Sequence, residues 1–169
     1  LYENLVFFDF TSMYGSVIVS FNLSKESFLE KKEKDTIEVD IGKKIYFLKD
    51  AGFFSKMLSD IIEKRKQYKK EYNRNPNALL KARSNAFKLL TNAAYGYLGF
   101  FGARYYCREA AASAAALARN SIKETIKFIE DEGYKVIYSD TDSISFLQDK
   151  KSKKDIEHLL EKINKTLPG

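Results

Sequence analysis

Two aspartates near the end of the chain lie at the tip of an expected hairpin. The run KVIYSDTDSISF, residues 135–146, places Asp140 and Asp142 in a short polar segment between two apolar, β-prone stretches. Asp and Ser stabilise tight turns because their side chains bond nearby backbone amides. Turn formation therefore explains this motif when it is taken alone, and a chemical role requires more acidic groups at the same place.

A third aspartate lies where it can supply such a group. Asp9 ends the apolar run of residues 5–8, which is typical of a strand buried on both faces. An ionised carboxylate there is costly unless it is paired or bound to a cation, although a turn cap is the alternative for Asp9 alone. If the hairpin lies beside this strand, three carboxylates converge at one sheet edge. Their repulsion favours a divalent cation such as Mg²⁺, which prefers oxygen ligands.

Two expected helices carry cationic and amide side chains at helical spacing. Arg65 and Lys69 are four residues apart on the first helix, and Lys88, Asn92 and Tyr95 follow the i, i+4, i+7 pattern on the second. A solvated face explains most of the lysines, but Asn and Tyr are poor choices for a merely soluble stripe. Cations on paired helices that face acidic metal sites would suit a triphosphate. Neither GxxxxGK[ST] nor GxGxxG occurs, so the chain has no glycine-rich phosphate loop of those kinds.

The remaining reactive residue types support other chemistry poorly. The only histidine, His158, lies in a polar helix face without a neighbouring His or Cys, which argues against metal binding or base catalysis there. The single Cys107 excludes an internal disulfide and a cysteine-based zinc site, and we expect it to be a buried small side chain. A Ser-His-Asp hydrolase is compatible with the composition, but no G-x-S-x-G context supports it.

The bulk composition is that of a soluble globular domain. The chain has 169 residues, of which 44% are hydrophobic and 31% charged, and a net charge of +6 permits a polyanionic partner. No apolar run is long enough to cross a bilayer and no signal-peptide pattern opens the chain. The chain begins at Leu1, which indicates a piece of a larger protein or a processed product.

The elements that must position these groups follow from periodicity. We expect a strand over residues 3–10, a hairpin over 36–48, and two antiparallel helices over 53–72 and 78–97, the second capped by Asn77. The apolar side of this second helix is expected to hold Leu79, Ala82, Ala86, Leu90 and Ala93.

The C-terminal part of the chain completes the pattern. A third helix over 107–132 ends at Gly133, the 135–147 hairpin follows, and Ile156, Leu159, Leu160 and Ile163 mark a last amphipathic helix. The fold class is therefore α+β, with helices packed against an antiparallel sheet.

Three motifs, in this order, resemble those of the family B (α-like) DNA polymerases, most closely the archaeal type. DFTSMYGSVI resembles motif A, KLLTNAAYGYLG resembles motif B, and YSDTDS resembles motif C. GFFSKMLSDIIEKRKQYKK is similar to the first fingers helix, and GARYYCREAAASAAALAR to the stretch after motif B. The resemblance covers nearly the whole chain, and the motif aspartates Asp9 and Asp140 are 131 residues apart (140 minus 9).

The resemblance implies template-directed DNA synthesis by a two-metal mechanism. Asp9 and Asp142 match the carboxylates that hold two Mg²⁺ ions, the Phe10 carbonyl matches a backbone ligand, and Asp140 matches a supporting aspartate. Tyr14 matches the residue that lies beneath the incoming sugar and excludes a 2′-hydroxyl. The other positions matched to nucleotide binding are Ser12, Met13, Arg65, Lys69, Lys88, Asn92 and Tyr95, with Gly96 near the nascent base pair.

Two positions depart from the family pattern. Gly15 stands where the family usually has Pro, and we expect a more flexible backbone there to loosen the steric gate. Ala93 stands in place of the usual Ser, which removes a hydroxyl but no charge.

The resemblance also implies domains and partners. Residues 1–50 and 99–169 correspond to the palm, with its antiparallel sheet, and residues 51–98 to a two-helix fingers insertion, whereas the thumb, exonuclease and N-terminal domains have no counterpart. The expected partners are primer-template DNA, deoxynucleoside triphosphates and the remaining polymerase domains, in the same chain or as a second subunit. We expect no membrane association, a cytoplasmic, nucleoid-associated prokaryotic location, and weak or absent activity of this segment alone.

Two alternatives remain at this stage. A catalytically silent, polymerase-like module would keep the fold for assembly or nucleic-acid binding, but loss of metal ligands would favour it and all three aspartates are present. A metal-dependent cyclase or nuclease on a similar palm has no need for the KxxxNxxYG helix.

Overall fold

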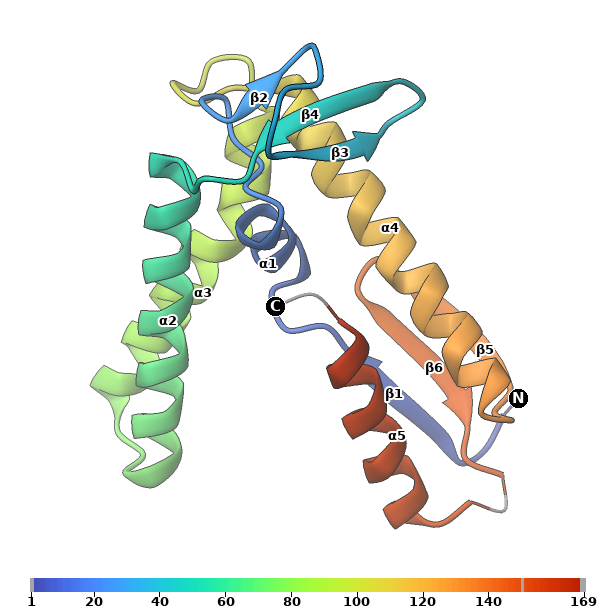
Figure 1. Cartoon of the computed structure of the whole chain (residues 1–169). Coiled ribbons are helices and arrows are strands. Elements are labelled where there is room, and N and C mark those ends of the chain that lie inside the picture. Colours follow the sequence, from blue (N-terminus) through green and yellow to red (C-terminus); the bar gives the residue numbers. More distant parts are fainter. Residues whose placement is uncertain (1, 150, 168–169) are drawn as a thin grey trace. The chain divides into compact units, whose positions relative to one another are not determined.

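The structure is a computed structural model that describes residues 2–149 and 151–167 (Figure 1). The chain divides into two compact units, each considered by itself. The terminal unit comprises the residues up to Met13 and those from Ala118 onward, and the central unit comprises Tyr14–Leu117. Pro168 and Gly169, at the end of the expected palm segment, lie outside the described residues.

The terminal unit contains an antiparallel sheet of three strands in the order β1-β6-β5. β1 spans Leu5–Asp9, β5 Val136–Asp140 and β6 Ser143–Leu147. The hairpin predicted over 135–147 is therefore confirmed, and the strand that ends at Asp9 pairs with it through β6.

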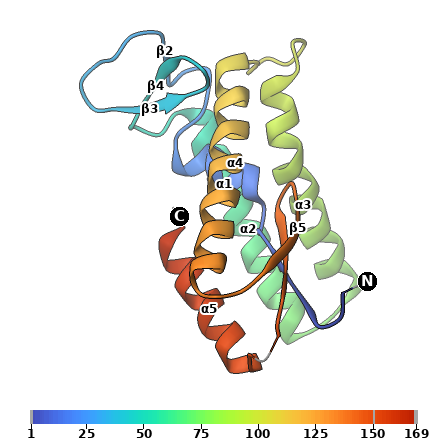
Figure 2. The same ribbon diagram turned by 90° about the vertical axis from the view of Figure 1, so that its right-hand side faces the viewer.

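One face of this sheet forms the core of the terminal unit. Ile144 and Phe146 of β6 are fully buried, and the Phe146 ring contacts Phe8 and Tyr134 at centroid distances of 4.9 and 5.2 Å. Two helices, α4 (Arg108–Asp131) and α5 (Lys153–Thr166), lie on the same side of the sheet (Figures 1 and 2). Gly133, at φ +83°, follows the end of α4 as predicted.

The prediction that β1 is buried on both faces is wrong for the described chain. Phe7 is 68% exposed, whereas its neighbour Phe8 is half-buried. Successive side chains of a strand point to opposite faces, and helices cover only one face of this sheet. The apolar residue Phe7 therefore lies on the open face.

The last helix is positioned by its N-terminus and one buried stripe. Ser152 accepts a hydrogen bond from the amide of Asp155, and the Asp155 carboxylate accepts one from the Ser152 amide, which makes a capping box. Leu159 and Ile163 are buried, but Leu160 is 41% exposed. Leu160 therefore lies outside the buried stripe, which follows the i, i+4 spacing.

The central unit contains a second sheet of three strands in the order β2-β4-β3. β2 spans Phe28–Leu29, β3 Thr36–Asp40 and β4 Lys44–Leu48, and the last two confirm the predicted hairpin. The unit also contains a helix that the sequence did not predict, α1 (Met13–Ser20). Its glycine and β-branched residues have low intrinsic helix propensity, so burial of residues such as Ile18 outweighs local preference.

Two long helices form an antiparallel pair in the central unit, as predicted (Figure 1). They are α2 (Phe53–Arg74) and α3 (Ala78–Gly99), and Asn77 caps α3 by accepting a 2.9 Å hydrogen bond from the Leu80 amide. Gly96 and Gly99 do not interrupt α3, which runs two residues beyond the predicted end at 97.

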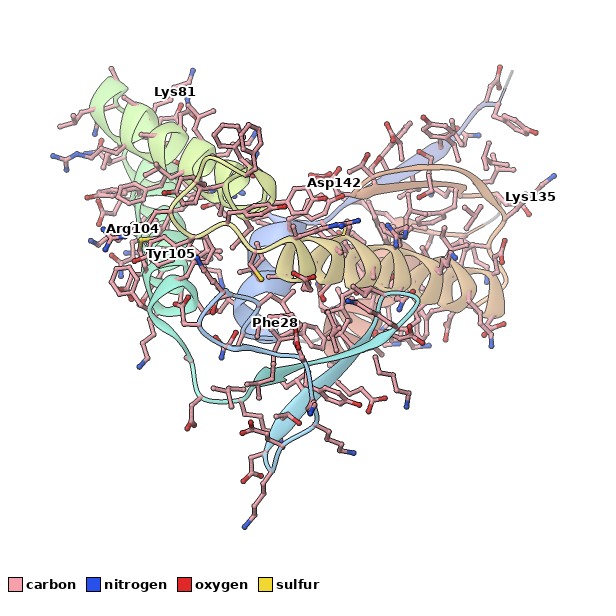
Figure 3. The ribbon with its side chains drawn as sticks, turned by 90° about the horizontal axis from the view of Figure 1, so that it is seen from above. Phe28, Lys81, Arg104, Tyr105, Lys135 and Asp142 are labelled. Atoms are coloured by element: carbon pink, nitrogen blue, oxygen red, sulfur yellow. The ribbon has the colours of Figure 1, made fainter. Side chains whose placement is uncertain are left out.

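Aromatic contacts show how the helix pair is held together. Phe54 lies against Tyr97 with ring centroids 6.4 Å apart, and Tyr68 lies against Phe87 at 5.4 Å. The two contacts run in opposite sequence directions along the two helices, which confirms the antiparallel packing. Near the start of α2, Phe54 also contacts Tyr105, and the Arg104 guanidinium lies 6.0 Å from the Tyr105 ring (Figure 3).

The predicted apolar side of α3 is wrong. Leu79 and Leu90 are 60% and 52% exposed, whereas Thr91, Ala94 and Leu98 are buried. The three other members of the predicted stripe, Ala82, Ala86 and Ala93, are also exposed. Residues of both stripes recur at helical spacing. Contacts with α1 and α2, and not hydrophobicity, determine that the stripe containing Thr91 is the buried one.

No helix in the described part of the chain combines the length and apolar character needed to cross a bilayer.

Candidate active site

Strand register places two of the predicted carboxylates around one serine. Ser143 on the central strand β6 pairs with Asp9 of β1 on one side and with Asp140 of β5 on the other. Side chains of residues directly opposite each other in an antiparallel pair project from the same face. Asp9 and Asp140 therefore share one face of the sheet. Phe7 and Tyr138 lie two residues earlier on the same strands and so on the same face, and both are largely exposed, which shows that this face is the open one.

The third carboxylate belongs to the turn that joins β5 and β6. The amide of Phe10, which follows Asp9, donates a 2.8 Å hydrogen bond to the Asp142 carbonyl and so fastens the end of β1 to this turn. Thr141 has φ +50°, and the Ser143 hydroxyl donates to the Asp140 carbonyl at 3.1 Å. Figure 3 shows Asp142 at the end of the hairpin away from Lys135. Backbone bonds thus bring segments 131 residues apart (140 minus 9) to one sheet edge.

The donor set at this edge suits a hard divalent cation. Asp9 and Asp140 are exposed and Asp142 is half-buried, and none of them takes part in an ion pair among the described residues. No group of three Asp, Glu, His or Cys side chains in the described ranges is arranged to hold one ion. Two carboxylates with the Phe10 carbonyl would leave positions open, as Mg²⁺ sites that also bind water or phosphate oxygens do. The residues present therefore fit Mg²⁺.

The groups predicted to bind the triphosphate lie on the helix pair of the central unit. Lys88 and Asn92 are exposed on successive turns of α3. On α2, Lys69 is exposed and Arg65 is half-buried. The four side chains thus extend from two packed helices.

Two predicted site residues are in direct contact. The rings of Tyr14 on α1 and Tyr95 on α3 stack with centroids 4.3 Å apart and an interplanar angle of 23°. Both side chains are half-buried, so each ring retains an accessible part. The sequence placed both residues at the nucleotide site without predicting that they touch.

The residues just before Tyr14 differ in what they can offer. Met13 is only 4% exposed, so its side chain belongs to the core and only its backbone can reach a nucleotide. Ser12 is half-buried at φ +55°, an uncommon angle for serine, immediately before α1 begins. Met13 is the first residue of α1, and the first amides of a helix lack intrahelical partners and suit anions.

The sequence did not predict that Gly15 packs closely against Thr91. Gly15 is buried within α1, and a Cβ atom built on it would lie 2.7 Å from the Thr91 methyl carbon. Gly15 therefore permits close packing of helices, in addition to any freedom it gives the backbone. The sequence signal that could have indicated this packing is a glycine among bulky residues, directly after the predicted site residue Tyr14.

The residues outside these clusters behave as expected. Cys107 is buried, and burial raises the pKa of its thiol. His158 is exposed on α5.

The model of DNA polymerase family B matches residues 1–167. The chain belongs to DNA polymerase family B. Its match to this family includes all three motifs and both units.

Curated relatives place the chain among archaeal family B polymerases. It is 37% identical to a DNA polymerase of Archaeoglobus fulgidus over 99% of this chain and 22% of the relative. It is 38% identical to a DNA polymerase of Thermococcus gorgonarius over 100% of this chain and 23% of the relative. The chain therefore spans less than a quarter of the length of these relatives.

A solved structure agrees with both the family and the fold. The family B DNA polymerase from Pyrobaculum calidifontis superposes with a TM-score of 0.80 at 31% identity, over 98% of this chain and 22% of that one. The α+β fold class with antiparallel sheets is thus confirmed.

Proposed function

We propose that this chain supplies the metal-binding carboxylates and the nucleotide-binding helices of a template-directed DNA polymerase. The observation that carries the proposal is the register at Ser143, which aligns Asp9 and Asp140 on one open face while Phe10 is bonded to Asp142. Membership of family B and the names of the relatives support DNA synthesis as the activity.

The reaction is nucleotidyl transfer. The primer 3′-oxygen forms a bond to the α-phosphorus of a deoxynucleoside triphosphate, the bond from that phosphorus to the bridging oxygen breaks, and pyrophosphate leaves. Two bound Mg²⁺ ions would stabilise charge on the attacking and leaving oxygens. Asp9, Asp142 and the Phe10 carbonyl would hold the ions, and Asp140 would support this arrangement from the opposite strand.

The central unit would bind the nucleotide. Lys88, Asn92 and Arg65, with Lys69, would contact the triphosphate through charge-assisted or amide hydrogen bonds. Tyr14 would lie beneath the sugar and exclude a 2′-hydroxyl, supported by the ring of Tyr95. Ser12 and Met13, at the start of α1, would contribute further contacts to the nucleotide.

The same proposal covers domains and partners. Residues 1–50 and 99–169 would form part of a palm, and residues 51–98 the fingers. Primer-template DNA, deoxynucleoside triphosphates and the remaining polymerase domains would be the partners, in the prokaryotic cytoplasm at the nucleoid. The segment alone would have weak activity or none, because it spans less than a quarter of the length of its relatives.

Single-turnover nucleotide incorporation tests this function, measured with the assembled polymerase, that is, this chain together with the remaining polymerase domains. Asp9→Asn and Asp142→Asn should each lower the rate at least about a hundredfold, as expected when one group that stabilises transition-state charge is lost. The melting temperature should not change, because Asp9 is exposed and its position is set by backbone pairing. Asp140→Asn should have a milder effect, and Asp149→Asn on the same unit is the control.

The alternative, a silent nucleic-acid-binding module, gives a different outcome. It would bind primer-template DNA but show no incorporation that depends on Asp9 or Asp142. Wild-type turnover in either variant would remove the metal assignment.

A further inference from the structure

We propose that Thr91 is a positioning residue for sugar selection, and that its methyl group, packed on Gly15, sets the orientation of the Tyr14–Tyr95 ring pair. The inference rests on the proposed function, in which Tyr14 excludes ribonucleotides. Thr91 itself is fully buried and contacts no substrate in this account.

Two neighbouring contacts, Tyr14 with Tyr95 and Gly15 with Thr91, join α1 to α3. Tyr14 and Gly15 are consecutive on the first turn of α1, and Thr91 and Tyr95 are one turn apart on α3. The Tyr14 ring stacks on Tyr95 at 4.3 Å, and the Gly15 backbone lies against the Thr91 methyl. A change in spacing at the glycine contact must therefore alter the ring contact beside it.

The glycine contact leaves no room for a side chain. A Cβ atom on Gly15 would lie 2.7 Å from the Thr91 Cγ2 atom and 3.5 Å from Cδ1 of Ile62 on α2. Carbon atoms normally approach to about 3.5–4.0 Å, so the first contact requires one of the partners to move.

Thr91 cannot move its methyl group freely. Its hydroxyl donates a 2.8 Å hydrogen bond to the Phe87 carbonyl, which fixes the side-chain rotamer of this β-branched residue. Rotation would leave a buried hydroxyl without its acceptor, because Thr91 is 0% exposed. The strain of a larger residue at Gly15 must therefore displace α1 and, with it, Tyr14.

The test measures the ratio of kcat/KM for a deoxynucleotide over its ribonucleotide in the assembled polymerase. Gly15→Ala should lower this ratio by roughly fivefold or more, as expected from part of the usual overpacking strain acting on the ring. Adding Thr91→Ser, which removes the methyl but keeps the hydroxyl, should restore the ratio to near that of Thr91→Ser alone. Adding Thr91→Val should not restore it, because valine replaces the hydroxyl with a second methyl, is itself restricted to one main rotamer in a helix, and so keeps a methyl group against Gly15.

A matched glycine substitution controls for general effects on the helices. A Cβ atom on Gly99 of α3 would lie 3.7 Å from the Ala111 Cβ, an ordinary contact, so Gly99→Ala should leave the ratio unchanged. An unchanged ratio in Gly15→Ala, or equal rescue by Thr91→Val and Thr91→Ser, would overturn the inference. If Gly15→Ala does not fold, the inference requires Gly15→Ala/Thr91→Ser to fold and to keep the ratio, and failure of this double variant also overturns it.

Tyr14→Ala separates this inference from the function on which it rests. A collapsed ratio in Tyr14→Ala together with an unchanged ratio in Gly15→Ala removes only the role of Thr91. An unchanged ratio in Tyr14→Ala removes the steric gate itself, and the positioning role with it.

Discussion

Two regions of the molecule position their predicted site residues in different ways. They are the carboxylate edge of the terminal unit, which comprises Asp9, Asp140 and Asp142, and the α2–α3 helix pair of the central unit. At the carboxylate edge, strand register and the bond from Phe10 to the Asp142 carbonyl fix the positions of the acidic residues. In the helix pair, ring contacts such as Tyr68–Phe87 hold α2 against α3, and the charged side chains extend from the outer surface.

At the carboxylate edge, the residues proposed to do chemistry are not the ones that stabilise the fold. In the helix pair, some of the same residues serve both purposes. Backbone bonds do not depend on the side chain at the same residue, so we expect Asp9 to be replaceable without loss of the fold. Thr91 and Tyr95, by contrast, contribute both to packing and to the position of a site residue. Substitutions on the two faces of α3 therefore test whether packing and chemistry can be separated in the helix pair.

The largest effect is expected from the packed face of α3. Leu98 is 0% exposed, so Leu98→Ala should cost about 2–5 kcal/mol of stability, the range for truncating a buried leucine. Leu90 on the same helix is 52% exposed, and Leu90→Ala should change stability by no more than about 0.5 kcal/mol. Urea unfolding of both variants measures the difference. Equal losses would show that the buried stripe has been assigned to the wrong face.

A smaller effect is expected from the charged surface of the same helix. Lys88→Ala should weaken nucleotide binding by about 1.5–3 kcal/mol through the loss of one charge-assisted contact to phosphate. The KM for nucleotide should rise while primer-template affinity stays the same. Lys81→Ala removes the same charge two turns earlier on α3 and is the control. A fall in DNA affinity without a change in KM would place Lys88 on a DNA-facing surface.

The smallest effect concerns charge at the start of α5. Hydrogen bonds from the Ser152 hydroxyl and then from its backbone amide hold the pKa of Asp155 below its usual value. A depressed pKa stabilises the fold above the unfolded-state pKa of about 3.9, and this contribution is lost as the pH falls through the folded-state value. Asp155→Asn keeps an acceptor but loses the charge, so it should be less stable than wild type at pH 7.

The difference between Asp155→Asn and wild type should shrink as the pH falls below about 4, where the wild-type carboxyl also becomes neutral. Unfolding midpoints measured across this range check the prediction, with Glu161→Gln on the same helix as the control. A difference that does not depend on pH would assign the effect to the shape of the cap instead of its charge.

The sequence predicted the elements with strong local signals. Both hairpins, the α2–α3 pair and the Asn77 cap are correct because turn residues, helical periodicity and capping chemistry act over a few positions. The sequence also singled out Asp9, Asp140 and Asp142, and the structure adds the register that aligns two of them, but their catalytic role stays a prediction.

The errors arise where tertiary packing decides the outcome. The buried face of α3 contains Thr91, which a hydrophobic pattern passes over, and α1 forms despite its poor helix propensity. The sequence also showed no sign that Gly15 packs against Thr91, 76 residues away (91 minus 15), whereas the looser backbone expected at Gly15 stays a prediction. No local pattern contains that information.

The central claim is that two distant segments bind the same catalytic metal ions, and metal-directed backbone cleavage tests it directly. Fe²⁺ supplied in place of Mg²⁺ to the assembled polymerase, with ascorbate and peroxide, generates radicals that cut the chain next to the bound ion. We predict cuts both near residues 9–10 and near residues 140–142, suppressed by excess Mg²⁺ and by Asp9→Asn. Cleavage of only one of the two segments, or cleavage that persists in Asp9→Asn, would contradict the account.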